Sequence, residues 1–294
     1  MKEVSNRIVE SAAFASTPIT LRQRNDLKFD FTQVPAHWFN GRMSLSHSLN
    51  AASLIAPPSE RYFVQVMREA KGLVPDHLEK LQQDMTGFIQ QEGMHARIHH
   101  QFNQHLTALG YEVEAINLMY ERMFNSFKKY SIRRQLAILA AGEHLTYVSA
   151  MLALATPVLD DAHPEARRMW CWHALEEVEH KSVAYDVCNY LGIGYFERVW
   201  GLYKVYATYG RCMDKASRML IKQENRAPRK INVNFTEMRK QMHRAFVSPG
   251  HLRMVGLEIL KYLNPRFEIW SNNKIAKDLA ILKAAEEDIY SYNH

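Results

Sequence analysis

The sequence predicts an all-α protein, and three observations support this fold class. From about residue 57 onward, apolar residues recur at intervals of three and four, which is the spacing of one helix face. Prolines and glycines fall between these periodic segments, where helices begin and end. The alternation typical of strands is absent, apart from a short segment reading LKFDFTQV that could be extended. Long helices with short connections indicate a helical bundle.

The chain is expected to form one compact domain with three parts. Residues 1–56 mix polar residues with few helical periods, which predicts a loop-rich N-terminal wrap. Residues 57–225 are expected to form the bundle, and residues 226–294 to add C-terminal helices after the basic stretch NRAPRKINVN. Apolar residues make up 47% of the 294 residues and charged residues 23%, the balance of a soluble protein with a sizeable core.

The bundle helices are delimited by proline, glycine and capping residues. Pro57 and Pro58 are expected to end the preceding segment, and Ser59 to cap a first helix that runs to about Gly72. The following helices are expected at about residues 75–109, 112–130, 132–159, 164–191 and 197–224.

Three of these helices carry ionisable residues in the middle of an otherwise apolar face. The face of helix 75–109 consists of Met85, Phe88, Glu92, His95, His99, Phe102, Leu106 and Leu109. The face of helix 132–159 consists of Leu136, Leu139, Glu143, Thr146, Ala150 and Ala153. The face of helix 164–191 consists of Met169, His173, Glu176 or Glu177, His180, Ala184, Val187 and Leu191. Positions with this spacing face the bundle interior, so the charges are predicted to point inward.

Inward charges at the same level of several helices indicate a metal centre. A buried carboxylate or imidazole is costly unless it is paired or coordinates a metal. Glu92 and His95, like Glu177 and His180, are three residues apart, about 60° around a helix, so each pair can reach one point. Glu143 has no basic partner on its own face. Bundles with two such Glu-x-x-His pairs and two further glutamates bind two metal ions.

The order Glu60, EGMH, Glu143 and EVEH resembles the ferritin-like di-iron superfamily. More specifically, VPAHWFNG, PPSERYF, FIQQEGMHARIHHQFN, GEHLT and WHALEEVEHKSVAYDV resemble a bacterial family labelled predicted metal-dependent hydrolase, over roughly residues 30–200. The site is also similar to p-aminobenzoate-type di-iron N-oxygenases, whose last helix carries His-x-x-x-Glu-x-x-His. The resemblance implies a ferritin-like four-helix bundle with additional C-terminal helices, and seven metal ligands: Glu60, Glu92, His95, Glu143, His173, Glu177 and His180.

Several positions have a second interpretation. Glu60 is expected in the first turn of its helix, where the helix dipole alone favours an acid. Glu176 competes with Glu177 for ligation, and only the Glu-x-x-His pattern favours Glu177. His99 is expected to contact a ligand rather than a metal, and Thr146 either packs in the core or hydrogen-bonds a species at the metals. Three histidines lie off the inward faces and are expected to be solvated or capping: His100, His105 and His144.

Two metal ions in such a site can perform two kinds of chemistry. With two iron ions, mixed carboxylate and imidazole ligands support activation of dioxygen. With zinc or manganese, the alternatives to iron, a two-metal site can hydrolyse an ester or phosphoester. We favour an oxygenase or oxidase acting on a small or apolar organic substrate, because the ligands lie mid-helix on apolar faces. Iron storage or a purely structural bundle is less favoured, because the chain is longer than a storage subunit needs.

The remaining sequence features bear on location and partners. Cys171, Cys188 and Cys212 have neither disulfide-framework nor CxxC spacing, which suits a reducing, cytoplasmic compartment. The apolar segment 136–159 is interrupted by Glu143 and His144, so no membrane span is predicted. The formal net charge of +6 leaves open a peripheral membrane contact, and a homodimer is also left open, but no nucleic-acid motif accompanies the scattered basic residues.

Overall fold

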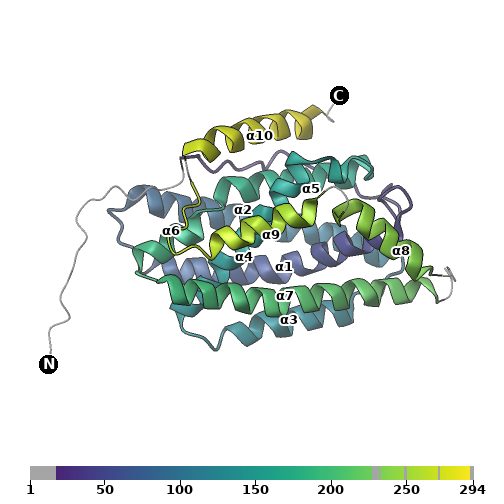
Figure 1. The fold of residues 1–294 in the computed structure, drawn as a ribbon, viewed down its shortest axis with the longest axis horizontal. Coiled ribbons are helices and arrows are strands. Elements are labelled where there is room, and N and C mark those ends of the chain that lie inside the picture. Colours follow the sequence, from purple (N-terminus) through teal and green to yellow (C-terminus); the bar gives the residue numbers. More distant parts are fainter. Residues whose placement is uncertain (1–17, 227–230, 232, 248–249, 271, 292–294) are drawn as a thin grey trace.

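The computed structural model describes residues 18–226, 231, 233–247, 250–270 and 272–291. Within these residues the chain is helical and contains no strand, which confirms the predicted all-α class. The bundle (Figure 1) consists of α1 (Met43–Lys71), α2 (Glu79–Ala108), α4 (Ile132–Ala155) and α5 (Pro164–His180). The other helices are α3 (Glu114–Phe127), α6 (Val183–Tyr190), α7 (Tyr195–Glu224), α8 (Phe235–Met242), α9 (His251–Tyr262) and α10 (Asn272–Ser291). Single turns cover Pro157–Leu159 and His243–Val247.

The first bundle helix begins earlier than predicted. α1 starts at Met43 and continues through Pro57 and Pro58, so the expected helix start at Ser59 is wrong. Glu60 therefore lies in the interior of α1 rather than in its first turn. The charge of a helix terminus falls off within one turn, so the helix dipole does not explain an acid at this position.

A side chain from α2 compensates for one of the prolines inside α1. Proline has no N–H, so it leaves the carbonyl four residues earlier without its usual donor. The Nδ2 of Asn103 on α2 donates to the carbonyl oxygen of Ser53, four residues before Pro57, at 2.9 Å. The donor comes from a different helix, which is why the local sequence pattern predicted a break here.

The predicted helix 164–191 is divided in two. α5 ends at His180 and α6 begins at Val183. At the interruption, the buried Nζ of Lys181 pairs with Asp278 of α10 at 2.5 Å and lies 3.6 Å from the ring centroid of Trp270. A buried ammonium needs such partners, and they come from the C-terminal part of the chain. The segment LKFDFTQV, residues 27–34, forms no strand either.

Residues 18–42, the described part of the predicted N-terminal wrap that precedes α1, form no helix and lie against the bundle. The ring of Phe29 lies 5.5 Å from that of Trp172 on α5. Trp38 is buried, and its Nε1 donates to Asn50 of α1 at 2.8 Å. Residues 1–17 lie outside the described residues, and the division of the chain into three parts stays a prediction.

α4 is the most apolar helix of the bundle. By length and by a mean hydropathy of 1.4 it is the one helix, within the described residues, that could cross a membrane. However, 67% of its apolar window is buried inside the protein, and it carries the buried Glu143. Its composition is therefore that of a core helix.

α4 and α7 approach closely at Gly201. A Cβ there would lie 2.2 Å from the carbonyl oxygen of Ala137, a backbone atom that cannot rotate away. We therefore expect Gly201→Ala to destabilise the protein by at least about 1–3 kcal/mol, the usual cost of overpacking. Gly210→Ala in the same helix is the matched control, because no atom lies within 4 Å and alanine favours a helix by about 1 kcal/mol. Urea midpoints compare the two, and equal effects would contradict the close packing.

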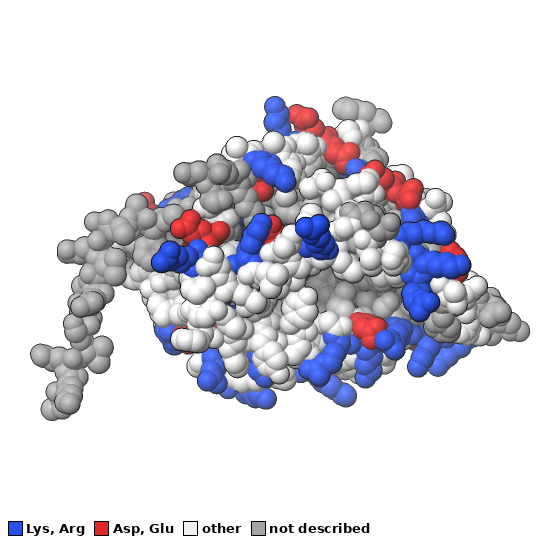
Figure 2. Space-filling view, viewed as in Figure 1, with Lys and Arg blue, Asp and Glu red and all other residues white. Residues whose placement is uncertain are grey.

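Charge is distributed unevenly over the surface. Figure 2 shows lysines and arginines along the lower edge of the view, over α3 and α7, and acidic side chains at the top over α10. The exposed basic residues of α7 include Arg211, Lys215, Arg218 and Lys222.

Candidate metal centre

The seven side chains predicted as ligands lie together inside the bundle, in two groups. In each group, one potential donor atom from every member lies within 4.8 Å of the others. The first group consists of Glu60, His95 and His173, and the second of Glu92, Glu143, Glu177 and His180. All four bundle helices contribute, and six of the seven residues are at most 4% exposed. The structure brings the predicted set together; that these residues bind metal stays a prediction.

The second group is centred on a ring nitrogen. The Nε2 of His180 lies 3.2 Å from a carboxylate oxygen of Glu92, 3.2 Å from one of Glu143 and 3.4 Å from Oε2 of Glu177. These residues come from α2, α4 and α5, and each is an ionisable residue in the middle of an otherwise apolar helix face. Three carboxylates and one imidazole of this kind suit a divalent iron, manganese or zinc ion.

Glu177 lies between the two groups. Its Oε1 is 3.0 Å from Nε2 of His173 and 3.7 Å from Nδ1 of His95, whereas its Oε2 faces His180. A carboxylate that presents one oxygen to each group is placed to bridge two ions. Glu176 instead contacts the opposite ring nitrogen of His95, Nε2, at 3.1 Å. The geometry therefore favours Glu177 over Glu176 as the ligand.

Many donor atoms of the two groups are buried without a hydrogen bond. Among the described residues these atoms are Oε2 of Glu60, both oxygens of Glu92, Nδ1 of His95, both oxygens of Glu143, Oε2 of Glu177 and Nε2 of His180. Buried polar atoms are normally satisfied, and each exception needs an explanation. Two cations would satisfy all of these atoms at once. The residues present therefore fit a dinuclear metal centre.

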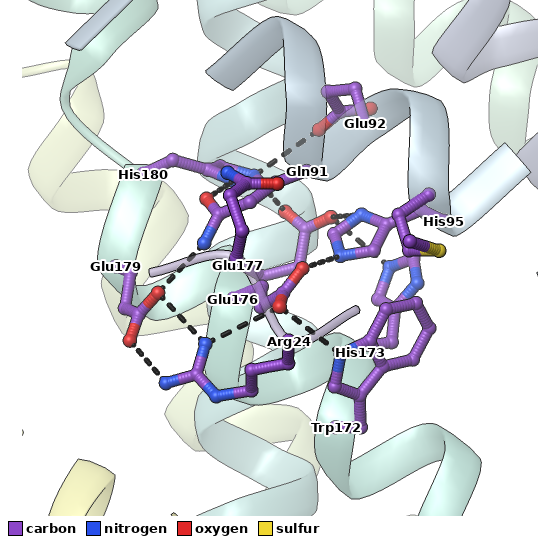
Figure 3. Close-up of polar contacts among 12 residues, drawn as sticks. Arg24, Gln91, Glu92, His95, Trp172, His173, Glu176, Glu177, Glu179 and His180 are labelled. Carbon is purple, nitrogen blue, oxygen red and sulfur yellow. Dashed lines mark hydrogen bonds and ion pairs between the residues drawn. The ribbon is translucent and has the colours of Figure 1, made fainter. Parts of the chain in front are cut away.

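Hydrogen bonds fix which nitrogen of His95 faces the centre (Figure 3). The Nε2 of His95 contacts Oε2 of Glu176. An ionised carboxylate has no proton to donate, so Nε2 of His95 carries the proton of this hydrogen bond. The Nδ1 of His95 is then left with a lone pair. Glu176 is held in turn by Nε1 of Trp172 at 3.1 Å and by Arg24 at 3.3 Å. Carboxylates in this position orient metal-binding histidines and raise their basicity.

A second chain of hydrogen bonds fixes His180. Its Nδ1 lies 3.0 Å from Oε1 of Gln91, while the amide nitrogen of Gln91 donates to Glu179 at 2.7 Å. Glu179 accepts from Arg24 at 2.6 Å, so Arg24 connects the supports of both histidines (Figure 3). Sequence reasoning missed Arg24, Gln91 and Glu179. Glu176 and Glu179 share one face of α5, but nothing local indicates that residue 24 lies beside them.

A third chain fixes His173, the ligand whose side chain is 12% exposed. Asn103 donates its Nδ2 to a backbone carbonyl, so its Oδ1 accepts from the hydroxyl of Ser53 at 2.8 Å. The hydroxyl then accepts from Nδ1 of His99 at 2.9 Å, and Nε2 of His99 accepts from Nδ1 of His173 at 2.9 Å. The Nε2 of His173 is thereby left free to face Glu177. The structure thus places His99 against His173, a candidate ligand, and the role of His99 stays a prediction.

The other singled-out residues belong to neither of the two groups. Thr146 is half-buried and its hydroxyl donates to the backbone carbonyl of Glu143 at 3.0 Å, so packing describes it better than catalysis. His100 is exposed, and His105 contacts the carbonyl oxygen of Val34 at 2.7 Å. The expectation that His144 is solvated or capping is wrong. It is buried under α9, where it stacks on Tyr262.

Burial and mutual repulsion shift the pKa values of the carboxyl groups. Burial, followed by the charges of neighbouring carboxylates, raises the pKa of Glu60 and of Glu143 well above the ordinary value. Burial would lower the pKa of His180, but Glu177 and the other carboxylates outweigh it and raise this pKa well above the ordinary value. Without metal, these shifts favour protonation of Glu60, Glu143 and His180.

Metal binding at neutral pH is consequently expected to release protons. Ligation needs Glu60, Glu143 and His180 deprotonated, whereas their raised pKa values favour the protonated forms in the metal-free centre. Affinity should weaken as the pH falls. Calorimetric titration with Mn²⁺ in two buffers of different ionisation enthalpy measures the protons released. Identical heats in both buffers would contradict this assignment.

One family matches the chain. The model of a family described as "Predicted metal-dependent hydrolase" matches residues 23–273, which includes all seven candidate ligands as well as Arg24. No curated protein and no solved structure matches the chain. The family description agrees with a metal centre and names hydrolysis, without naming a metal or a substrate.

Proposed function

The chain belongs to the family of predicted metal-dependent hydrolases, and we propose that its bundle holds two metal ions that serve a catalytic reaction. The observation that carries this proposal is the position of Glu177, whose two oxygens face two separate groups of buried donors. A site for a single ion would need only one such group. A purely structural core would be expected to leave few buried polar atoms without a well-formed hydrogen bond, whereas these two groups contain many.

We further propose that the ions are iron and that the reaction uses dioxygen. Four carboxylates and two imidazoles are the donor set of di-iron and di-manganese bundles, and His173 offers a third imidazole here. Two ferrous ions in such a site supply electrons for the reduction of dioxygen. The centre is almost completely buried, which suits a small gas molecule and a small or apolar organic substrate.

The chain's own residues would keep this centre in one arrangement. Glu176, Gln91 and His99 each hold one ligand histidine in a single orientation. Arg24 neutralises Glu176 and Glu179, so that the supports do not add uncompensated negative charge beside the ligands. His173 marks the side of the centre that is nearest to solvent, since the other ligands are at most 4% exposed.

Hydrolysis is the second candidate, and the family description favours it. Two zinc or manganese ions can bind an ester or phosphoester oxygen and lower the pKa of a bound water. The same seven residues would serve as ligands. The difference lies in the ions and in how a substrate reaches them.

One experiment separates the two reactions. The protein is loaded anaerobically with Fe²⁺ or with Zn²⁺, and each form is tested for oxygen consumption, for an absorption change on admission of oxygen, and for cleavage of p-nitrophenyl esters and phosphoesters. The oxygenase proposal predicts oxygen uptake by the iron form and no cleavage by the zinc form. Anaerobic turnover by the zinc form, with an iron form inert to oxygen, would establish the hydrolase instead.

A further inference from the structure

We propose that His37, His47 and Glu224 form a separate cation site, of a kind that suits Zn²⁺. His37 lies in the segment before α1, His47 lies on α1, and Glu224 is the last residue of α7. Thirteen positions separate His47 from Glu60 on α1, so at about 1.5 Å per residue this site is about 20 Å from the bundle centre. It is therefore independent of the function proposed above.

The three side chains converge on one point. The Nε2 of His47 lies 2.8 Å from Oε1 of Glu224, and the Nε2 of His37 lies 3.2 Å from the same oxygen. One donor atom from each residue lies within 4.8 Å of the others. His47 and Glu224 are completely buried, whereas the side chain of His37 is 21% exposed.

One oxygen of Glu224 is buried without a hydrogen bond, namely Oε2. The other oxygen is crowded, because His47, His37 and the hydroxyl of Tyr111 all approach Oε1. The buried Nε2 of His37 lies 3.2 Å from this crowded oxygen and makes no well-formed hydrogen bond. An ionised carboxylate can accept at both of its oxygens. A cation bound between His37 and Glu224 would give Oε2 a partner and Nε2 of His37 a better one.

The competing account is a hydrogen-bonded cluster without metal. In that account Nε2 of His47 and the hydroxyl of Tyr111 donate to Glu224, and Asn50, 3.4 Å from Nδ1 of His47, donates to the ring. It explains the contacts of His47 and allows Nε2 of His37 to donate to Oε1, but it leaves Oε2 of Glu224 without a partner. A metal on Nε2 of His47 would move the ring proton to Nδ1, and the amide of Asn50 would then have to turn away from the ring.

The chemistry of the cluster suits zinc. Two imidazoles and one carboxylate are a known zinc ligand set, with a fourth position left to water. The partial exposure of His37 provides access for that water. The ion would join the segment before α1, α1 itself and the end of α7.

The test measures zinc uptake by protein whose bundle is already loaded with iron. Wild type, His37→Ala and His100→Ala are dialysed against micromolar Zn²⁺, and zinc and iron per chain are determined by mass spectrometry. His100 is an exposed histidine on α2 and serves as the matched control. We expect wild type and His100→Ala to bind one more zinc per chain than His37→Ala, with equal iron in all three. Equal zinc in wild type and His37→Ala overturns the proposal.

A second measurement needs no variant, and so does not depend on whether His37→Ala folds. Crystals of the wild-type protein soaked in Zn²⁺ are measured on both sides of the zinc absorption edge. The proposal predicts an anomalous peak bounded by His37, His47 and Glu224. Zinc peaks elsewhere with none at this position would establish the hydrogen-bonded cluster instead.

Discussion

Glu177→Gln is expected to abolish retention of both metal ions while leaving the bundle folded. Glu177 presents Oε1 to His95 and His173 and Oε2 to His180, so one substitution removes a charged donor from both groups. Burial would raise the pKa of Glu177, but His180 and His173 outweigh it and hold it well below the ordinary value, so the side chain is available as a carboxylate. Loss of a residue behind a ligand costs about 10–100-fold in metal affinity, and loss of a bridging ligand should exceed about 100-fold.

Glu60→Gln and Glu143→Gln are the matched controls for this prediction. Each removes one buried carboxylate from one group only, Glu60 from the first and Glu143 from the second. Metal analysis after dialysis should therefore show about one ion per chain for each control and almost none for Glu177→Gln, with helical content unchanged by circular dichroism. If Glu177→Gln keeps one ion as firmly as the controls do, Glu177 does not bridge the two groups.

Arg24→Ala is expected to destabilise the fold by about 3–5 kcal/mol, the usual effect of removing one partner of a buried ion pair. The guanidinium of Arg24 is 2% exposed and bonds to Glu176 and Glu179, which are also buried. Burial already raises the pKa of Glu176 to about 7, against the opposing charge of Arg24. Without Arg24, Glu176 would take up a proton and Glu179 would lose its cation, so the supports of His95 and His180 would both change. Weaker metal binding should accompany the loss of stability.

Arg22→Ala is the control for Arg24→Ala. Arg22 pairs with Glu286 of α10, and the side chain of Arg22 is 58% exposed. Exposed pairs contribute about 0–1 kcal/mol, so this change should shift the urea midpoint little. A double variant with Glu179→Gln should recover part of the loss caused by Arg24→Ala, because it removes the stranded charge. If Arg22→Ala and Arg24→Ala have equal effects, the buried network does not stabilise the protein.

The helices and the inward-facing positions of the candidate ligands could be predicted because both follow local rules. Intervals of three and four identify the buried face of α2, α4 and α5. A Glu-x-x-His pair places two donors on that face independently of the conformation of the connecting loops. Glu60 shows the limit of such rules. Its helix was expected to start at Ser59 because prolines usually end helices. In the structure the helix continues, and Asn103 of α2 donates to the carbonyl oxygen of Ser53, which Pro57 leaves without a backbone donor.

The surroundings of the ligands could not be predicted, because they depend on segments distant in sequence. Arg24 lies more than 150 positions before Glu179, in a segment without periodicity. His144 was placed off the inward faces correctly, but α9 covers that side of α4, so the side chain is buried all the same. Such contacts are set by tertiary packing, which a single helical pattern does not report.

The central claim is that the bundle holds two metal ions, and anomalous diffraction from crystals grown with saturating Fe²⁺ under anaerobic conditions tests it most directly. Data on both sides of the iron edge, with metal analysis of the same protein, locate and count the ions. The account predicts two peaks, one beside Glu60, His95 and His173 and one among the other four ligands, with Glu177 between them. A single peak at full occupancy, or no iron among these residues, would contradict it.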